Sequence, residues 1–477
     1  MSFQTPSRLL DLAGQSLLGD KALAHSALEC LPSDLFPPLF MQAFFGRHGE
    51  YVKAMVCAWP FDCLPLGGLM QMPQQGTLQA VFEGLDTLLA QKVRPRRWRL
   101  RVLDLRNTGQ DFWSRGSGAR APARSRTGPV AEGHSGARQP LAPLEVFIDL
   151  CFSDRMQDHF FTFLISWAKE REGSLHLCCK TLKIFAVPVK NIRPLALVQL
   201  DCIQEVEVSC PWSLYSLGTF ASYLGQMTNV RRLSLSHAHM PASREEDRKE
   251  EHRVARFTSQ FLRLRRLQKL HLDSPTFLAG HLDRMLSSLQ TCLESFSITN
   301  CLLMELDVMH LSLCKSLHQL KHLDLSGVYL TEFNPELLYA LLEEVTATLQ
   351  VLDLVYCGIT DTHAEAILPA LSCCHQLRAL SLSGNPLSLA ATGKLLRHTA
   401  GLGSLSFELY PAPVESYNAH GGLELGKLAQ IRDELTGILR DLGRSRTIQL
   451  SASPCPHCGE SVSYQVEPIL FSCDNPA

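Results

Sequence analysis

The residues best suited to chemistry lie near the C-terminal end of the sequence. Cys455 and Cys458 are separated by two residues, one of them His457, and Gly459 follows. Two thiolates at this spacing can hold one zinc ion, while the glycine permits a tight turn. A structural zinc site needs four ligands, and Cys473 is the one further cysteine downstream. Two interpretations stay open: a turn without metal, which we favour, and a structural zinc site that uses Cys455, Cys458 and Cys473.

The sequence contains none of the arrangements that are typical of an active site. It has no Gly-rich phosphate loop, no G-x-S-x-G and no H-E-x-x-H. Cysteines 178, 179, 373 and 374 lie in apolar segments and are expected in the core. We therefore expect a protein that is not an enzyme and that needs no cofactor.

Two further patterns have both a functional and a structural interpretation. L-x-x-L-L occurs at residues 85–89 and 338–342, where a helix could fit a nuclear-receptor groove, although the same leucines suit a core. Five arginines crowd around Trp98 in residues 94–101. They are expected to form a solvated edge or to contact an acidic partner, rather than to bind nucleic acid.

Composition limits the class of protein. The chain has 477 residues and a net charge of −2, which excludes a surface that is basic throughout. The sequence has 17 cysteines, and its first residues show no apolar run of the signal type. We therefore expect reduced thiols, in the cytoplasm with the nucleus as a further location. No apolar run approaches the roughly 18 residues of a membrane helix, and no membrane association is expected.

A repeat determines the expected fold. The pattern L-x-x-L-x-L-x-x-N/C, typical of leucine-rich repeats, is complete at Leu293, Leu349 and Leu377. The Asn or Cys that ends the motif is expected to hydrogen-bond exposed backbone in the turn. Looser copies begin at residues 100, 203, 230, 267, 320 and 402. Amphipathic segments follow the strands, for example the one that begins at Asn334-Pro335, a helix cap and a first helical position. We predict an α/β leucine-rich repeat solenoid, or horseshoe, with a parallel concave sheet and an N-terminal helical cap.

The chain then divides into five parts. Residues 1–92 form a helical region, and residues 93–113 hold the first leucine-rich strand. Residues 114–143 are rich in Gly, Ala, Arg, Ser and Pro and are expected to be a disordered loop. The repeat array follows at 144–450, beginning with helical patterning over 144–177. A cysteine-containing tail occupies 451–477.

Any partner should meet the concave sheet, where residues between the buried leucines point outward. The candidate substrate-binding residues are Arg232, Lys269, His271, His322, Asp324, Asp353, Tyr356 and Glu408. Their mixed charge does not identify a target.

The sequence resembles the PRAME family of leucine-rich proteins nearly from end to end. The motifs that carry the resemblance are LAGQSLL at 12–18, LFPPLF at 35–40, AWPF at 58–61, VRPRRW at 93–98, VLDLR at 102–106, LCCK at 177–180, SITNC at 297–301 and CPHCG at 455–459. The resemblance implies a substrate receptor of a cullin-2 ubiquitin ligase with a RING subunit, recruited through elongin B and elongin C. It also implies, for some members, repression of retinoic-acid receptor signalling.

The N-terminal spacing agrees with an elongin-binding helix. Leu9, Ala13 and Leu17 recur at i, i+4 and i+8, and therefore share one helix face. Arg8 departs from such boxes, which usually carry a small residue or proline there. An ordinary capping helix would show the same spacing.

A second box follows downstream. Leu31, Pro32, Leu35 and Leu39 resemble a cullin-selecting box, in which a proline fixes the entry of a helix. The choice of cullin follows from the resemblance alone. Two alternatives remain for the function: a corepressor scaffold of nuclear receptor signalling, and a protein-binding horseshoe without a ligase role.

Overall fold

The computed structural model describes most of the chain. The described residues are 30–69, 75–91, 99–106, 112–113, 143–153, 159–171, 173–237, 247–443, 448–452 and 462–465, with the single positions 16 and 28. They fall into two compact units. The first comprises residues 1–150, 157–180 and 196–199, and the second comprises residues 151–156, 181–195 and 200–477. Of the loop predicted at 114–143, residues 114–142 lie outside the described residues.

The first unit combines short helices with parallel strands. Its elements are η1 (Ser33–Leu35), α3 (Phe36–Phe45), α4 (Gly49–Cys57), β1 (Cys63–Leu64), η2 (Leu66–Leu69), α5 (Gln75–Leu89), β2 (Val102–Asp104), most of β3 (Leu144–Ser153), α7 (His159–Glu170) and the first half of β4 (Leu175–Phe185). β1 pairs with β2 in parallel, so the region predicted to be helical already contains a strand.

An aromatic cluster around Trp59 forms the core of this unit. The ring centroids of Trp59 and Phe40 are 5.2 Å apart, and those of Phe40 and Trp113 are 5.5 Å apart. The indole N–H of Trp59 donates to the carbonyl of Cys63 at 3.0 Å, and Trp59 is fully buried. A buried indole whose only polar atom is satisfied can pack without a desolvation cost.

The expectation of helical patterning at the start of 144–177 is wrong for its first part. Residues Leu144–Ser153 form strand β3, which pairs with β2 in parallel. The burial of L-E-V-F-I-D-L alternates with a period of two, as a strand requires. The helical patterning of residues 160–167 is confirmed, because this segment lies in α7.

The second unit is the repeat array. Its strands are β5 (Glu205–Ser209), β6 (Arg232–Ser236), β7 (Lys269–Asp273), β8 (Ser295–Thr299), β9 (His322–Asp324), β10 (Val351–Asp353), β11 (Ala379–Ser381), β12 (Phe407–Pro411), β13 (Gln449–Ala452) and β14 (Val462–Gln465). Neighbours in this order are paired, all in parallel except β13 with β14.

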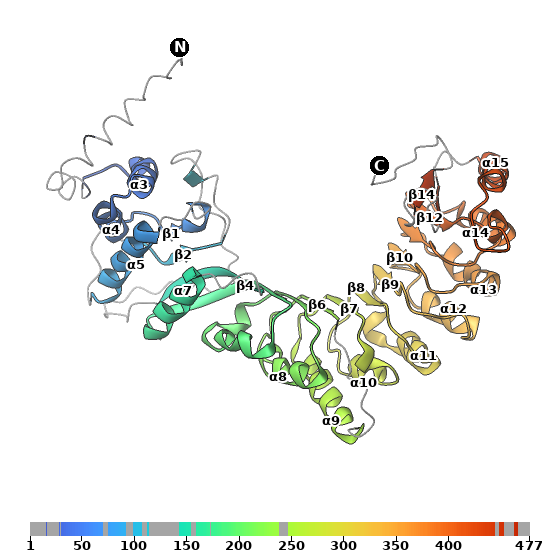
Figure 1. Cartoon of the computed structure of the whole chain (residues 1–477), viewed down its shortest axis with the longest axis horizontal. Helices are drawn as coiled ribbons and strands as arrows, with labels where there is room; N and C mark the ends of the chain where they lie inside the picture. Colours follow the sequence, from blue (N-terminus) through green and yellow to red (C-terminus); the bar gives the residue numbers. More distant parts are fainter. Residues whose placement is uncertain are drawn as a thin grey trace, which may run out of the picture. The chain divides into compact units, whose positions relative to one another are not determined.

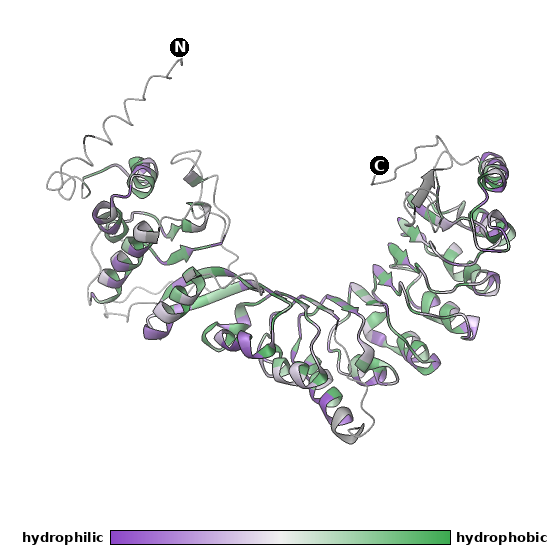
Figure 2. Ribbon diagram, in the orientation of Figure 1, coloured by the Kyte–Doolittle hydropathy of each residue, from purple (hydrophilic) through white to green (hydrophobic). Residues whose placement is uncertain are grey.

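Helices link the strands. They are α8 (Leu214–Leu224), α9 (Asp247–Thr258), α10 (Leu282–Ser287), α11 (Glu305–Leu313), α12 (Pro335–Glu343), α13 (Asp361–Ser372), α14 (Leu389–Thr399) and α15 (Leu425–Asp441). The 3-10 segments are η4 (Val189–Leu197), η5 (Leu200–Cys202), η6 (Ser259–Arg263), η7 (Thr276–Leu278), η8 (Lys315–Leu317) and η9 (Val414–Ser416). Within this unit the strands line the inner side and the helices the outer side (Figure 1). The helices carry both polar and apolar residues (Figure 2), and the apolar ones are those that are buried, as in Leu338, Leu341 and Leu342 of α12.

The strand register aligns the leucines of successive repeats. Leu270 pairs with Leu233 on one side and with Phe296 on the other, and Leu323 pairs with Leu352. These side chains are at most 1% exposed. Complete burial of such a side chain contributes about 1.5–3 kcal/mol, and only stacked repeats can achieve it.

The turns after β8 to β11 repeat a left-handed backbone position. Asn300, Gly327, Tyr356 and Gly384 occupy this position in successive repeats, with φ of 51°, 74°, 54° and 72°. Asn385 then holds the turn, because its Oδ1 accepts the N–H groups of Cys357 at 3.0 Å and Ile359 at 2.9 Å. The predicted role of the motif's last residue in binding turn backbone is thereby confirmed.

Candidate functional site: the inner face of the repeat array

The inner face is the surface of strands β5 to β12 that the helices leave uncovered. Alternate residues of each strand point to it. The strand register lines these residues up in rows that cross the strands. One row consists of Glu205, Arg232, Lys269, Ser295, His322, Val351, Ala379 and Phe407. The next row contains Ser234, His271, Ser297, Asp324, Asp353 and Ser381.

Seven of the eight residues predicted for this face lie on it or at its edge. Arg232, Lys269 and Tyr356 are exposed, and the other four, His271, His322, Asp324 and Asp353, are partly buried. The face is basic on β6 and β7 and acidic on β9 and β10.

Hydrogen bonds join the central side chains across strands. Ser297 Oγ lies 2.7 Å from Nδ1 of His271 and donates to Asp324 Oδ2 at 2.8 Å. His322 Nε2 lies 3.1 Å from Asp353 Oδ2. Because Ser297 gives its proton to Asp324, its hydroxyl is not activated by His271 as a nucleophilic serine would be. The network fixes the side chains in place, and a fixed surface loses less entropy when it binds a partner.

Glu408 was predicted to be on this face, and the prediction is wrong. It pairs with Leu380 in the row of buried leucines and is 2% exposed. The repeat predicted to start at Leu402 therefore starts at Leu405, in step with Leu377. The buried carboxylate accepts a hydrogen bond from the hydroxyl of Tyr410 at 2.8 Å. Phe407 takes the outward position instead and is 39% exposed.

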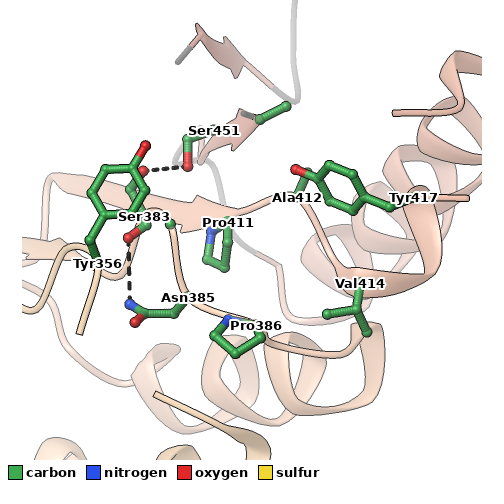
Figure 3. Close-up of a pocket in the computed structure, with 11 residues that line it drawn as sticks. Tyr356, Ser383, Asn385, Pro386, Pro411, Ala412, Val414, Tyr417 and Ser451 are labelled. Carbon is green, nitrogen blue, oxygen red and sulfur yellow. Dashed lines mark hydrogen bonds between the residues drawn. The ribbon is translucent and has the colours of Figure 1, made fainter. Parts of the chain in front are cut away.

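A hollow of about 270 Å³ lies at the C-terminal end of this face, around the turns that follow β10, β11 and β12 (Figure 3). Apolar and aromatic residues supply most of its lining, and two serines and an asparagine add polar groups. The residues that Figure 3 labels in this lining are Tyr356, Ser383, Asn385, Pro386, Pro411, Ala412, Val414, Tyr417 and Ser451. Ser383 Oγ donates to Ser451 Oγ at 2.6 Å within this lining. Sequence reasoning found only Tyr356, since the prolines belong to turns without a repeat signature.

Tyr356 is held rigidly although it is 48% exposed. Its φ of 54° is rare for a residue with a side chain, and its N–H donates to the carbonyl of Ser383 at 2.9 Å. A Cβ on Gly384 would come within 2.3 Å of the Tyr356 ring, so only glycine fits beneath it. Rigid exposed aromatic residues are typical anchors of protein interfaces.

The N-terminal candidates are only partly described. Leu9, Ala13 and Leu17 lie outside the described residues. Leu31 and Leu35 are partly buried, Pro32 is exposed, and α3 begins only at Phe36. Leu39 is 5% exposed and sits in the core of the first unit, so its predicted place in a cullin-contacting surface is wrong.

The structure describes some of the cysteines singled out in the sequence. Cys455, Cys458 and Cys473 lie outside the described residues. In the part of the chain that the structure describes, no group of three or more possible ligands gathers for a metal ion. Cys178, Cys179 and Cys374 are buried as predicted, but Cys373 is exposed. No disulfide joins cysteines within the described ranges.

Five of the six leucines in the two L-x-x-L-L segments lie in the core, and Leu89 is partly buried. Leu85 and Leu88 are at most 3% exposed, as are Leu338, Leu341 and Leu342. Neither helix can offer them to a receptor groove while the chain is folded. No helix in the described ranges has the length and apolarity to cross a membrane.

Stacked parallel strands with buried leucines, outer helices and an asparagine-held turn define a leucine-rich repeat protein. Sequence comparison identifies the family: the PRAME N-terminal domain matches residues 6–113 and the PRAME C-terminal domain matches residues 144–473. The chain therefore belongs to the PRAME family.

Several human relatives align with nearly the whole chain. PRAME family member 12 is 53% identical, with 99% of each chain covered. PRAME family member 8 is 51% identical over 99% of this chain and 100% of its own, and member 22 is 43% identical over 98% of each. Among solved structures, an internalin from Listeria monocytogenes covers 52% of this chain and 62% of its own, at 15% identity and a TM-score of 0.29. Family and fold together are those of a protein-binding leucine-rich repeat scaffold.

Proposed function

We propose that this protein is a non-catalytic substrate receptor of a cullin-2 RING ubiquitin ligase. In this role elongin B and elongin C recruit its N-terminal region, and the inner face holds a target protein. The other subunits then transfer ubiquitin to the target, which leads to degradation by the proteasome. The receptor acts by proximity, because it raises the local concentration of target lysines near the loaded transfer enzyme.

The inner face is the observation that carries this proposal. Side chains such as Arg232, Lys269 and Tyr356 are exposed there on a rigid sheet, and the described fold does not use them for its own core. A surface of fixed, partly apolar and partly charged groups suits the recognition of another protein.

Two N-terminal segments support the recruitment step. The spacing of Leu9, Ala13 and Leu17 fits an elongin-binding helix, and the exposed Pro32 with Leu31 and Leu35 fits a cullin contact. The family resemblance points to the same partners. We place the complex in the cytoplasm, with the nucleus as a further location. Burial of the L-x-x-L-L leucines gives no support to a nuclear-receptor corepressor that works through those helices.

Recruitment is tested by co-purification of the full chain with elongin B and elongin C. The proposal predicts a stable complex for the wild type and its loss for Leu9→Asp, which places a charge on the contact face. Gln15→Asp is the matched control, because a helix places residue 15 on the face opposite to residues 9, 13 and 17, and it should bind as the wild type does. Failure of the wild type to bind the elongins would refute the ligase role.

A further inference from the structure

Six exposed cations gather where strands β6 and β7 begin. Arg231 directly precedes β6, Arg232 is the first residue of β6, and Lys269 is the first residue of β7. Arg263 ends η6 (Ser259–Arg263), and Arg265 and Arg266 lie in the turn that leads from it to β7. We call these six residues the basic patch: Arg231, Arg232, Arg263, Arg265, Arg266 and Lys269.

The backbone brings the members of the patch together. Arg232 and Lys269 are direct partners in the parallel register of β6 and β7. The N–H of Lys269 donates to the carbonyl of Arg231 at 2.9 Å, and the N–H of Arg265 donates to that of Arg263 at 3.0 Å. Adjacent strands lie about 4.8 Å apart, so the two opposed cations are close neighbours.

Glu205 on β5 is the register partner of Arg232, but within the described residues no carboxylate forms an ion pair with the patch. None of its six members takes part in an ion pair, whereas Lys183, Arg284, Lys321 and Lys394 each pair with a glutamate. Like charges placed opposite each other on neighbouring strands are destabilising. The core beneath the patch is built from Leu233 and Leu270, so the fold does not depend on the positive charges of the patch. The arrangement costs stability in the free protein, and an anion bound across the strands would remove that cost.

Acidic side chains limit the patch on both sides. Glu205 and Glu207 lie on β5, and Asp324 lies on β9, two strands from β7 and therefore about 10 Å away. A long polyanion that ran across the strands would meet these carboxylates. A short anionic segment would be attracted by the patch and repelled beyond it.

We propose that the basic patch binds a short acidic segment of a protein partner, rich in Asp and Glu or phosphorylated. This proposal rests on the proposed function and supplies the chemistry of the target. The arginine planes suit carboxylate and phosphate oxygens, which they can bind in a bidentate manner. Nucleic acid is the less suitable ligand, because single strands are held by stacking on exposed aromatic rings, and Phe261, the one aromatic residue within 261–270, is fully buried.

The test is fluorescence polarisation with the full chain and three labelled probes. The first is a peptide with a central run of glutamates, about ten residues long, which spans the patch when extended. The second replaces the glutamates with lysines, and the third is an oligothymidine of equal charge. We expect the glutamate peptide to bind, more weakly as salt is raised, and the lysine peptide not to bind.

Variants locate the binding. Arg232→Glu with Lys269→Glu should lower affinity for the glutamate peptide at least about tenfold, equal to ~1.4 kcal/mol. Arg232→Gln with Lys269→Gln should give a smaller loss in the same direction, and circular dichroism checks the fold of each variant. Arg378→Glu is the matched control, since Arg378 is an exposed cation just before β11 on the same edge, far from the patch. Its affinity should stay near that of the wild type.

Three results would overturn the proposal: equal binding of the two peptides, no effect of the paired variants, or tighter binding of the oligothymidine than of the glutamate peptide. The assay contains no elongin and leaves residue 9 unchanged. Its failure is therefore distinct from failure of the elongin co-purification, and either result can stand without the other.

Discussion

Replacement of Asn385 by alanine should destabilise the repeat array more than most single changes. Its side chain is 4% exposed and makes four strong hydrogen bonds to backbone. Oδ1 accepts from the N–H groups of Cys357 and Ile359 at 3.0 and 2.9 Å, and Nδ2 donates to the carbonyls of Leu354 and Leu382, both at 2.7 Å. Alanine can make none of them.

The magnitude follows from the four backbone groups that lose their partner. A buried polar group without a partner costs about 1–3 kcal/mol. The low end applies here, because Asn385 lines the hollow of Figure 3 and water can reach some of the freed groups. The sum is about 4 kcal/mol of the free energy of unfolding.

The assay is urea-induced unfolding of the full chain, followed by circular dichroism. Asn334→Ala is the control, because Asn334 also caps backbone but is exposed and accepts a single N–H, from Glu336 at 3.1 Å. The expected loss for the control is about 1 kcal/mol. If the two variants lose equal stability, the reasoning about the Asn385 turn is wrong.

Three other predictions concern separate parts of the chain. Burial raises the pKa of the Cys374 thiol to about 12, so near neutral pH alkylation should label the exposed Cys373 and spare its neighbour until the pH approaches that value, as peptide mass mapping would show. Gly384→Ala should cost at least about 1–2 kcal/mol on thermal unfolding, because its φ is 72° and the added Cβ meets the Tyr356 ring; an unchanged melting temperature would argue against this contact. Asp86→Ala should lower the free energy of unfolding by about 1 kcal/mol, because the partly exposed Asp86 carboxylate accepts hydrogen bonds from the indole of Trp167 and the guanidinium of Arg171. Asp86→Asn should lose less than Asp86→Ala in the same unfolding measurement.

The repeat array could be predicted from sequence because its period and its burial coincide. Leu349 and Leu377 begin complete motifs, and both are fully buried one repeat apart. The turn role of Asn385 also followed, since an amide can satisfy both N–H and carbonyl groups. These features depend on local spacing alone.

Features that depend on register between repeats could not be predicted in this way. Leu402 and Leu405 both precede an alternating strand, and only the pairing of Leu380 with Glu408 shows which one begins the repeat. Glu408 therefore takes a buried leucine position, where its Oε2 accepts hydrogen bonds from the hydroxyl of Tyr410, two residues further along the strand, and from the hydroxyl of Thr399 at the end of α14.

The site shows the same division. Arg232, Lys269 and Tyr356 were predicted to be on the inner face from strand alternation alone, and they are exposed there. The hollow that Tyr356 shares with Pro386 and Pro411 was missed, because it is formed by turns from three repeats. Assembly of non-repeating turns depends on packing that no single repeat encodes.

The central claim is that the N-terminal segment binds the ligase subunits while the inner face binds a target protein. The most direct test is affinity capture from cells with three forms of the chain: wild type, Leu9→Asp, and Arg232→Glu with Lys269→Glu. We predict that Leu9→Asp loses the elongins and cullin-2 while it keeps the proteins bound to the inner face. The paired variant should keep the ligase subunits and lose at least one protein with an acidic segment. Identical sets of partners for all three forms would contradict this account.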